Sequence, residues 1–123
     1  MASPPPLPSI RDLVSVIRQR EGVDAAVVLG RDGLLIDGQL AAGLDAEDIA
    51  ARIPAIITSA DELGSATNRG DLRTAVLELK SGTAIVSVLS TDAVLLVLVA
   101  HGANIAQLLF ELRRHREHIA ALV

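Results

Sequence analysis

The hydrophobic pattern is most uniform at residues 93–100, AVLLVLVA, where eight apolar residues follow one another. Side chains alternate between the two faces of a strand, so an all-apolar strand needs cover on both faces. Residues 23–30 have nearly the same character. The pattern therefore predicts two central strands in a sheet that carries helices on both sides.

Three more polar stretches are predicted as the remaining strands, at 34–38, 72–80 and 83–90. Asp32 and Gly33 lie between the first two strands and predict an antiparallel hairpin, because such turns need a residue with positive φ. A serine-glycine pair and a threonine-aspartate pair predict tight turns between the last three strands. With the first and fifth strands both central, the simplest strand order is 2-1-5-4-3.

Apolar residues recur at helical spacing in three segments, 9–21, 46–66 and 102–122. Ser9 and Asp45 are the predicted N-caps of the first two helices, because their side-chain oxygens accept hydrogen bonds from first-turn amides. The expected buried stripes are Ile10, Leu13, Val14 and Ile17; Ile49, Ile53, Ile56, Ala60 and Leu63; and Ile105, Leu108, Leu109, Leu112 and Ile119. The resulting order of elements, α-β-β-α-β-β-β-α, is an α+β arrangement.

The predicted helix at 46–66 has a second side that is only weakly polar. Ala51, Ala55 and Thr58 lie roughly half a circle away from the isoleucine stripe, at ~100° per residue. Small residues allow another helix to approach closely, although alanine is also explained by helix propensity alone. Pro54 removes one main-chain donor, so we expect a kink there or a division into two shorter helices.

The third strand, at 72–80, lies at one edge of the predicted sheet and is long and apolar for that position. An open edge of this kind exposes unpaired backbone groups and invites pairing with another strand. A second copy of the same strand across a two-fold axis is the simplest cover. The sequence therefore predicts self-association through this strand.

The composition of the chain mainly excludes classes of partner and of site. The 123 residues carry a net charge of -4, one aromatic side chain (Phe110) and no cysteine, which argues against a nucleic-acid partner and excludes disulfides and thiolate metal sites. Mean hydropathy is +0.46, but no segment reaches the about 20 apolar residues of a membrane span, so we expect apolar surface to be hidden against a partner. The absence of cysteine removes any redox clue to the compartment, and we expect the cytoplasm by default. Residues 1–8, with PPPLP, are expected to form a flexible tail, and residues 9–123 a single domain.

The spacing of polar residues yields no catalytic motif. A lysine-serine pair at 80–81 lacks the glycine of a phosphate-binding loop and follows a strand. His115 and His118 stand three residues apart but lack a third metal ligand, and no histidine is placed to activate a serine. We therefore expect no enzyme activity, no metal and no cofactor, and we interpret the Arg-Gly-Asp triplet at 69–71 as a turn.

Together these elements resemble the roadblock family, which includes dynein light chains of that name and bacterial partners of small Ras-like GTPases. The resemblance depends on GVDAAVVLGRDGLLID at 22–37, DAEDIAARIPAIITSADELG at 45–64 and DAVLLVLVAHGANIAQLLFELRR at 92–114. It implies a roadblock/profilin-like fold, with the second helix on one face of the sheet and the first and third helices on the other. It also implies a homodimer in which the third strands pair and the second helices lie side by side.

The dimer interface expected from these observations comprises Ala51, Pro54, Ala55, Thr58, Leu72, Thr74, Val76 and Glu78. The resemblance implies a non-enzymatic adaptor or regulator, with a Ras-like GTPase docked on the paired second helices at Glu47, Asp48, Arg52, Ser59 and Glu62. Arg52 and Arg31 are candidates for an arginine supplied in trans to the transferring phosphate, although exposed arginines also serve solubility alone. Two alternatives stay open, a small-molecule sensor and a structural subunit that pairs with another roadblock protein.

Overall fold

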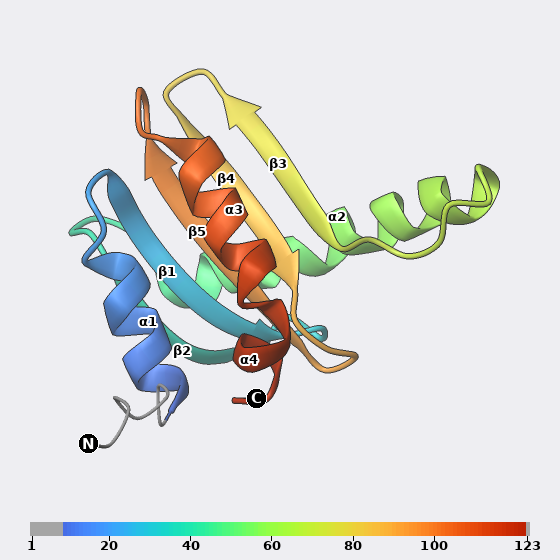
Figure 1. Ribbon diagram of the computed structural model, residues 1–123, viewed down its shortest axis with the longest axis horizontal. Coiled ribbons are helices and arrows are strands. Elements are labelled where there is room, and N and C mark those ends of the chain that lie inside the picture. The colour runs from blue at the N-terminus through green and yellow to red at the C-terminus, as the bar shows by residue number, and fades with distance from the viewer. Residues whose placement is uncertain (1–8, 123) are drawn as a thin grey trace.

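The computed structural model describes residues 9–122, and the predicted tail at 1–8 lies outside them. In chain order the elements are α1 (Ile10–Arg18), β1 (Val23–Gly30), β2 (Leu35–Leu40), α2 (Ala46–Ala66), β3 (Thr74–Leu79), β4 (Gly82–Val88), β5 (Ala93–Ala100), α3 (Ile105–Arg114) and α4 (Arg116–Ala120). Figure 1 shows the sheet with α1 and α3 in front of it and α2 behind it.

The five strands form one antiparallel sheet in the order β2-β1-β5-β4-β3. This confirms the predicted order, including the two central strands. Val27 of β1 lies opposite Leu96 of β5, and both are fully or almost fully buried. An all-apolar sequence is stable at this position because helices cover both faces of the sheet.

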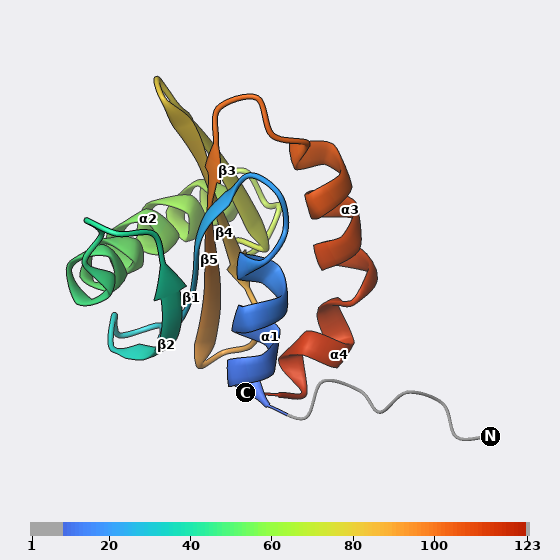
Figure 2. The ribbon, with the colours of Figure 1, turned by 90° about the vertical axis from the view of Figure 1, so that its left-hand side faces the viewer.

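The two faces of the sheet carry separate apolar clusters, and Figure 2 shows from the side the helices that lie over each face. On one face α1, α3 and α4 pack over β-strand residues that include Val28, Ile85 and Leu95. On the other face α2 alone packs over residues that include Val86 and Leu96. This distribution of helices is the one that the roadblock resemblance implies.

The β1–β2 hairpin forms where Asp32 and Gly33 predict it, but β2 begins and ends later than expected, at Leu35–Leu40. The reason is the length of the turn. The Gly33 amide donates to the Gly30 carbonyl at 2.9 Å, and the Gly30 amide donates to the Leu34 carbonyl at 2.8 Å. Leu34 therefore closes the turn instead of beginning the strand.

Helix α2 runs without interruption through Pro54, so the alternative of two shorter helices is wrong. Its predicted stripe needs a second correction, because the buried residues are Ala50, Ile53 and Ile57. Leu63, which we expected in the stripe, is 66% exposed. Figure 1 shows the cause, since the C-terminal part of α2 extends past β3 and beyond the edge of the sheet.

The expected C-terminal helix is two helices, α3 and α4, which meet at His115. The predicted stripe nevertheless holds, since Leu108 and Leu112 before the break and Ile119 after it are all buried. After the break, the guanidinium of Arg116 donates to the Val88 carbonyl at 2.9 Å and to the Thr74 hydroxyl at 2.8 Å. These long-range bonds fix α4 against the edge of the sheet.

Candidate partner-binding surface

The edge of the sheet at β3 is open, because within residues 9–122 this strand pairs only with β4. The Val88 amide donates to the Arg73 carbonyl at 2.9 Å, so these two residues form a hydrogen-bonded pair in register with the β3–β4 ladder. Hydrogen-bonded pairs alternate along an antiparallel ladder. The main-chain N–H and C=O groups of Thr74, Val76 and Glu78 therefore point away from β4, toward the open edge.

The side chains of the same three residues lie on the α3 face of the sheet, while Ala75 and Leu77 pack in the α2-side cluster. Val76 is 45% exposed, which is high for a β-branched strand residue. Leu72, expected as part of the same interface, precedes β3 and packs in the α2-side cluster. The predicted strand residues of the interface are thus brought together at the edge, with Leu72 beside them.

The outer surface of α2 carries the other predicted residues. Ala51, Ala55 and Thr58 are exposed on one strip of the helix, and Pro54 is half-buried beside them. The predicted docking residues Glu47, Asp48, Arg52, Ser59 and Glu62 are all exposed on the same outer surface. The structure therefore places both predicted sets on a single helix surface that no described part of the chain covers.

Arg52 and Asp48 form an ion pair one turn apart, with nitrogen and oxygen 3.1 Å from each other. The hydrogen bond to the Asp48 carboxylate raises the pKa of Arg52. Both side chains are more than half exposed, and exposed pairs of this kind contribute little to stability. Arg52 is therefore free to change partners when another protein approaches.

Arg31 is held differently from Arg52. Its guanidinium donates to the Asp61 carboxylate at 2.9 Å, and the same carboxylate accepts the Leu72 amide at 2.7 Å. Asp61 on α2 thus ties the β1–β2 hairpin and the segment before β3 to one side chain. Of the two arginines predicted as candidates, only Arg52 is exposed and bonded solely within its own helix.

The hairpin adds apolar residues that the hydrophobic pattern alone does not assign to a surface. Leu34 is 69% exposed and Ile36 is 49% exposed. The hairpin sits against α2, because a Cβ on Gly33 would lie 3.1 Å from Pro54 Cγ. Consecutive apolar residues on a predicted edge strand were the available signal, but only the contact with Pro54 places them beside the outer surface of α2.

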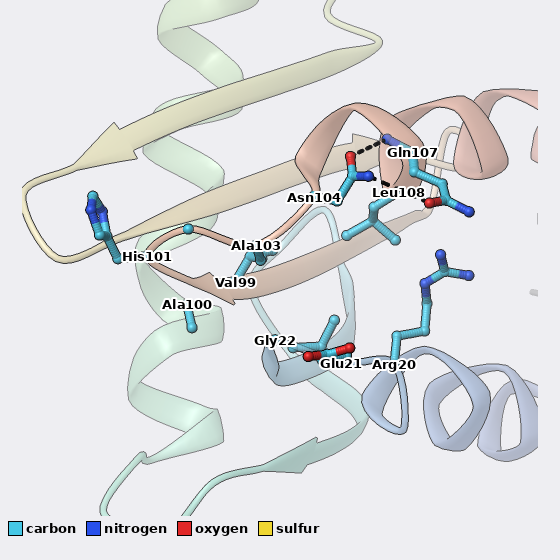
Figure 3. A pocket seen from close by; sticks show the side chains of 12 residues that line it. Arg20, Glu21, Gly22, Val99, Ala100, His101, Ala103, Asn104, Gln107 and Leu108 are labelled. Atoms are coloured by element: carbon cyan, nitrogen blue, oxygen red, sulfur yellow. Dashed lines mark hydrogen bonds between the residues drawn. The ribbon is translucent and has the colours of Figure 1, made fainter.

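A concave region of about 600 Å³ lies where the start of α3 faces the end of α1, drawn in Figure 3. Three of the polar side chains that line it, those of Arg20, Asn104 and Gln107, already serve the local structure. Asn104 caps α3 by accepting the Gln107 amide at 3.1 Å, and Arg20 forms an ion pair with Glu111. The other two, Glu21 and His101, are exposed, so the cavity offers few fixed polar groups to orient a ligand.

In the part of the chain that the structure describes, no three metal-ligating side chains gather in one place. No helix between residues 9 and 122 is both long and apolar enough to cross a membrane. The histidines at 115 and 118 lie at the junction of α3 and α4 and within α4, both exposed.

A model of the Roadblock/LC7 domain matches residues 10–99. The chain belongs to the Roadblock/LC7 family, as the sequence resemblance predicts. The uncharacterized protein MJ1340 of Methanocaldococcus jannaschii is 27% identical to it over 106 residues, which span 86% of this chain and 92% of that protein.

Solved structures agree with this assignment. A Roadblock/LC7 domain from Streptomyces avermitilis is 28% identical, with a TM-score of 0.78 over 90% of this chain and 94% of that chain. The gliding protein MglB from Thermus thermophilus has the same fold at 13% identity, with a TM-score of 0.81 over 98% of this chain and 93% of that chain. MglB has also been solved in a tetrameric arrangement, and that structure has a TM-score of 0.81 to this chain.

Proposed function

We propose that the chain is a homodimeric regulatory adaptor that binds a Ras-like small GTPase on the outer surface of α2. The observation that carries the proposal is the combination of an open β3 edge with an uncovered helix surface beside it. Each of these features alone is common on protein surfaces. Together they form two halves of one self-complementary interface, which is what a two-fold dimer requires.

The β3 edge supplies the main-chain hydrogen bonds of the interface. The outward N–H and C=O groups of Thr74, Val76 and Glu78 match the same groups of a second copy in an antiparallel pair. Pairing of two β3 strands joins two five-stranded sheets into one continuous sheet of ten strands. It also removes an apolar open edge, which otherwise promotes irregular association.

Helix α2 supplies the second part. Ala51, Ala55 and Thr58 have small side chains, so the backbones of two helices can approach closely along this strip. The end of α2 that extends past β3 carries the exposed Leu63. In a dimer the sheet of the partner lies beyond β3, so it covers this end and buries Leu63.

The remaining strip of α2 is available to a GTPase. Asp48, Arg52 and Ser59 provide polar contacts that can exchange water for partner groups. Leu34 and Ile36 on the hairpin provide exposed apolar side chains, which interfaces need at their centre. Fold similarity to MglB and the roadblock resemblance support a GTPase as the partner and self-association as the state of the adaptor.

The proposal is tested with a purified P-loop GTPase whose gene adjoins that of this chain. Calorimetry with the GTPase loaded with GDP or with a non-hydrolysable GTP analogue is expected to show binding that depends on the nucleotide. Leu34→Asp is expected to weaken binding at least about tenfold, because it places a charge among apolar contacts. Val16→Asp is the matched control, since Val16 is 49% exposed on α1 at the opposite face of the sheet.

Equal binding by both variants would refute the docking surface, and no binding with either nucleotide would refute the GTPase as partner. Hydrolysis rates with wild type and with Arg52→Ala then separate two outputs. A rate that rises with the adaptor and falls with the variant indicates that Arg52 acts on the transferring phosphate in trans. An unchanged rate indicates an adaptor that only positions the GTPase.

A further inference from the structure

Five arginines surround an open groove at the edge of the sheet, on the side opposite to the α2 surface. These residues, Arg69, Arg73, Arg113, Arg114 and Arg116, define what we call the arginine groove. Its volume is about 800 Å³, and an adjoining hollow of about 640 Å³ shares Arg69, Arg73 and Arg116 with it. The chain as a whole carries a net charge of -4, so this concentration of positive charge is local.

The loop that supplies Arg69 and Arg73 is held in place by close contacts with α2. A Cβ on Gly64 would lie only 1.7 Å from the Gly70 carbonyl oxygen, so the loop rests directly on the helix backbone. The Arg69 amide donates to the Gly64 carbonyl at 2.8 Å, and Asn68 adopts a left-handed φ of 57°. This packing fixes the backbone of the loop from which the Arg69 and Arg73 side chains extend.

The opposite wall of the groove comes from the junction of α3 and α4. Arg113 and Arg114 end α3, and Arg116 begins α4 after the break at His115. Arg116 is the most enclosed of the five, and it is anchored by its bonds to Val88 and Thr74. These two bonds occupy only part of the five N–H donors of a guanidinium.

The carboxylates that line the groove balance only part of its positive charge. Asp71 and Glu117 also line the groove, yet the ion pairs among residues 9–122 lie elsewhere and involve none of the five arginines. Burial lowers the pKa of Arg116, and repulsion from Arg73 and Arg113 lowers it further. Five guanidinium groups and two carboxylates thus line one groove, and an anion between the arginines would offset the repulsion that Arg116 experiences from Arg73 and Arg113.

We propose that the arginine groove binds a small phosphate-bearing anion, with Arg73, Arg113 and Arg116 as its principal ligands. Guanidinium groups match phosphate oxygens with two parallel hydrogen bonds, and arginines from three separate segments can surround one polyphosphate group. The groove lies on the α3 and α4 side of the sheet, so this site is separate from the α2 surface proposed for the GTPase. It adjoins the proposed dimer edge, because Thr74 lines the groove with its side chain and belongs to the β3 edge with its main chain.

Other classes of ligand fit the groove less well. Nucleobases are commonly bound by aromatic stacking, and Phe110, the one aromatic residue of the chain, is not among the lining residues. An acidic peptide needs apolar anchors as well as charge, and the residues that line the arginine groove itself are all polar or charged. Apolar residues such as Leu72 and Leu89 line only the adjoining hollow, so an acidic peptide is one of the outcomes that the test below distinguishes. A volume of about 800 Å³ lies within the range of small-molecule sites.

The test uses calorimetry of the full chain with inorganic tripolyphosphate in about 0.1 M KCl, where nonspecific attraction is screened. We expect a dissociation constant of about 0.1 mM or tighter, as three charge-assisted contacts provide. Arg73→Gln and Arg113→Gln are each expected to weaken binding at least about tenfold. Arg11→Gln, which removes an exposed arginine on α1, is the matched control and is expected to change the constant less than about twofold.

Further arms distinguish the source of the phosphate. Sedimentation with phosphatidylcholine vesicles that contain a phosphorylated inositol lipid shows a headgroup ligand if the protein pellets, and a soluble ligand if it does not. Both results support the phosphate site, provided that tripolyphosphate binds and that Arg73→Gln weakens this binding.

Three results would overturn the proposal. The first is no tripolyphosphate binding at millimolar concentration. The second is an equal effect of Arg11→Gln and Arg113→Gln, which would mean that net charge alone is responsible. The third is tighter binding of an octaglutamate peptide than of tripolyphosphate. Because both substituted side chains are exposed, unchanged thermal melting of the variants separates loss of ligand from loss of fold.

Discussion

Replacing Val76 with proline removes a single backbone donor at the middle of the β3 edge. The Val76 N–H points away from β4, so the substitution leaves the β3–β4 ladder intact, and proline is tolerated in edge strands at such positions. In the proposed dimer the same N–H donates to a carbonyl of the partner strand. The two-fold axis doubles every change, so each dimer loses two hydrogen bonds.

The expected magnitude follows from these two bonds. Each contributes about 1 kcal/mol net, and each leaves a partner carbonyl without its donor at a similar cost, which gives about 2–4 kcal/mol per dimer. The dimer dissociation constant is then expected to rise between about 30-fold and 1,000-fold. Sedimentation equilibrium over a range of concentrations measures this constant directly.

A control for this experiment is Ala75→Pro. Its N–H belongs to the hydrogen-bonded set that faces β4, so this substitution is expected to destabilise the fold itself by about 3 kcal/mol or more. Val76→Pro is expected to keep the wild-type circular dichroism spectrum, and Ala75→Pro is expected to lose stability to urea. If Val76→Pro dissociates at the same concentration as the wild type, the β3 edge is not the interface.

Three further substitutions test the contact between two α2 helices, the loop that rests on α2, and the buried stripe of α2. Ala55→Arg places like charges across the contact between two α2 helices, so gel filtration is expected to show at least about a tenfold rise in the dimer dissociation constant; an unchanged elution profile would exclude this helix contact. Gly64→Ala forces its Cβ toward the Gly70 carbonyl and is expected to lower the free energy of unfolding in urea by about 1–3 kcal/mol; a neutral result would mean that the loop does not rest on α2. Ile57→Ala is expected to lower the free energy of unfolding by about 2–5 kcal/mol. Leu63→Ala is expected to lower it by less than about 0.5 kcal/mol in a dissociated protomer. Equal losses of stability would contradict the corrected stripe of α2.

The features that the sequence predicted correctly depend on local rules. The run at 93–100 has no polar residue, and alternation alone then requires cover on both faces of β5. Ser9 caps α1 as predicted, accepting the Asp12 amide at 3.2 Å. Hairpins that join β1 to β2, β3 to β4 and β4 to β5 then left one simple order for the sheet.

The features that the sequence missed depend on distances between elements. The periodicity of α2 continues to Leu63, but the sheet ends beneath the helix before that residue, and no local pattern encodes the width of a sheet. The break at His115 occurs without glycine or proline, and Arg116 is fixed after it by groups on β3 and β4. The arginine groove was missed for the same reason, because a loop and two helices supply its residues.

Hydrogen exchange along β3 tests whether a second copy covers the open edge. We expect the amides of Thr74, Val76 and Glu78 to exchange slowly at protein concentrations above the dimer dissociation constant and to lose this protection on dilution. The amides of Ala75 and Leu77, which face β4, are expected to stay protected at both concentrations. Fast exchange of the three outward amides at every concentration, together with a solution mass of 12.8 kDa, would contradict the dimer and the adaptor surface built on it.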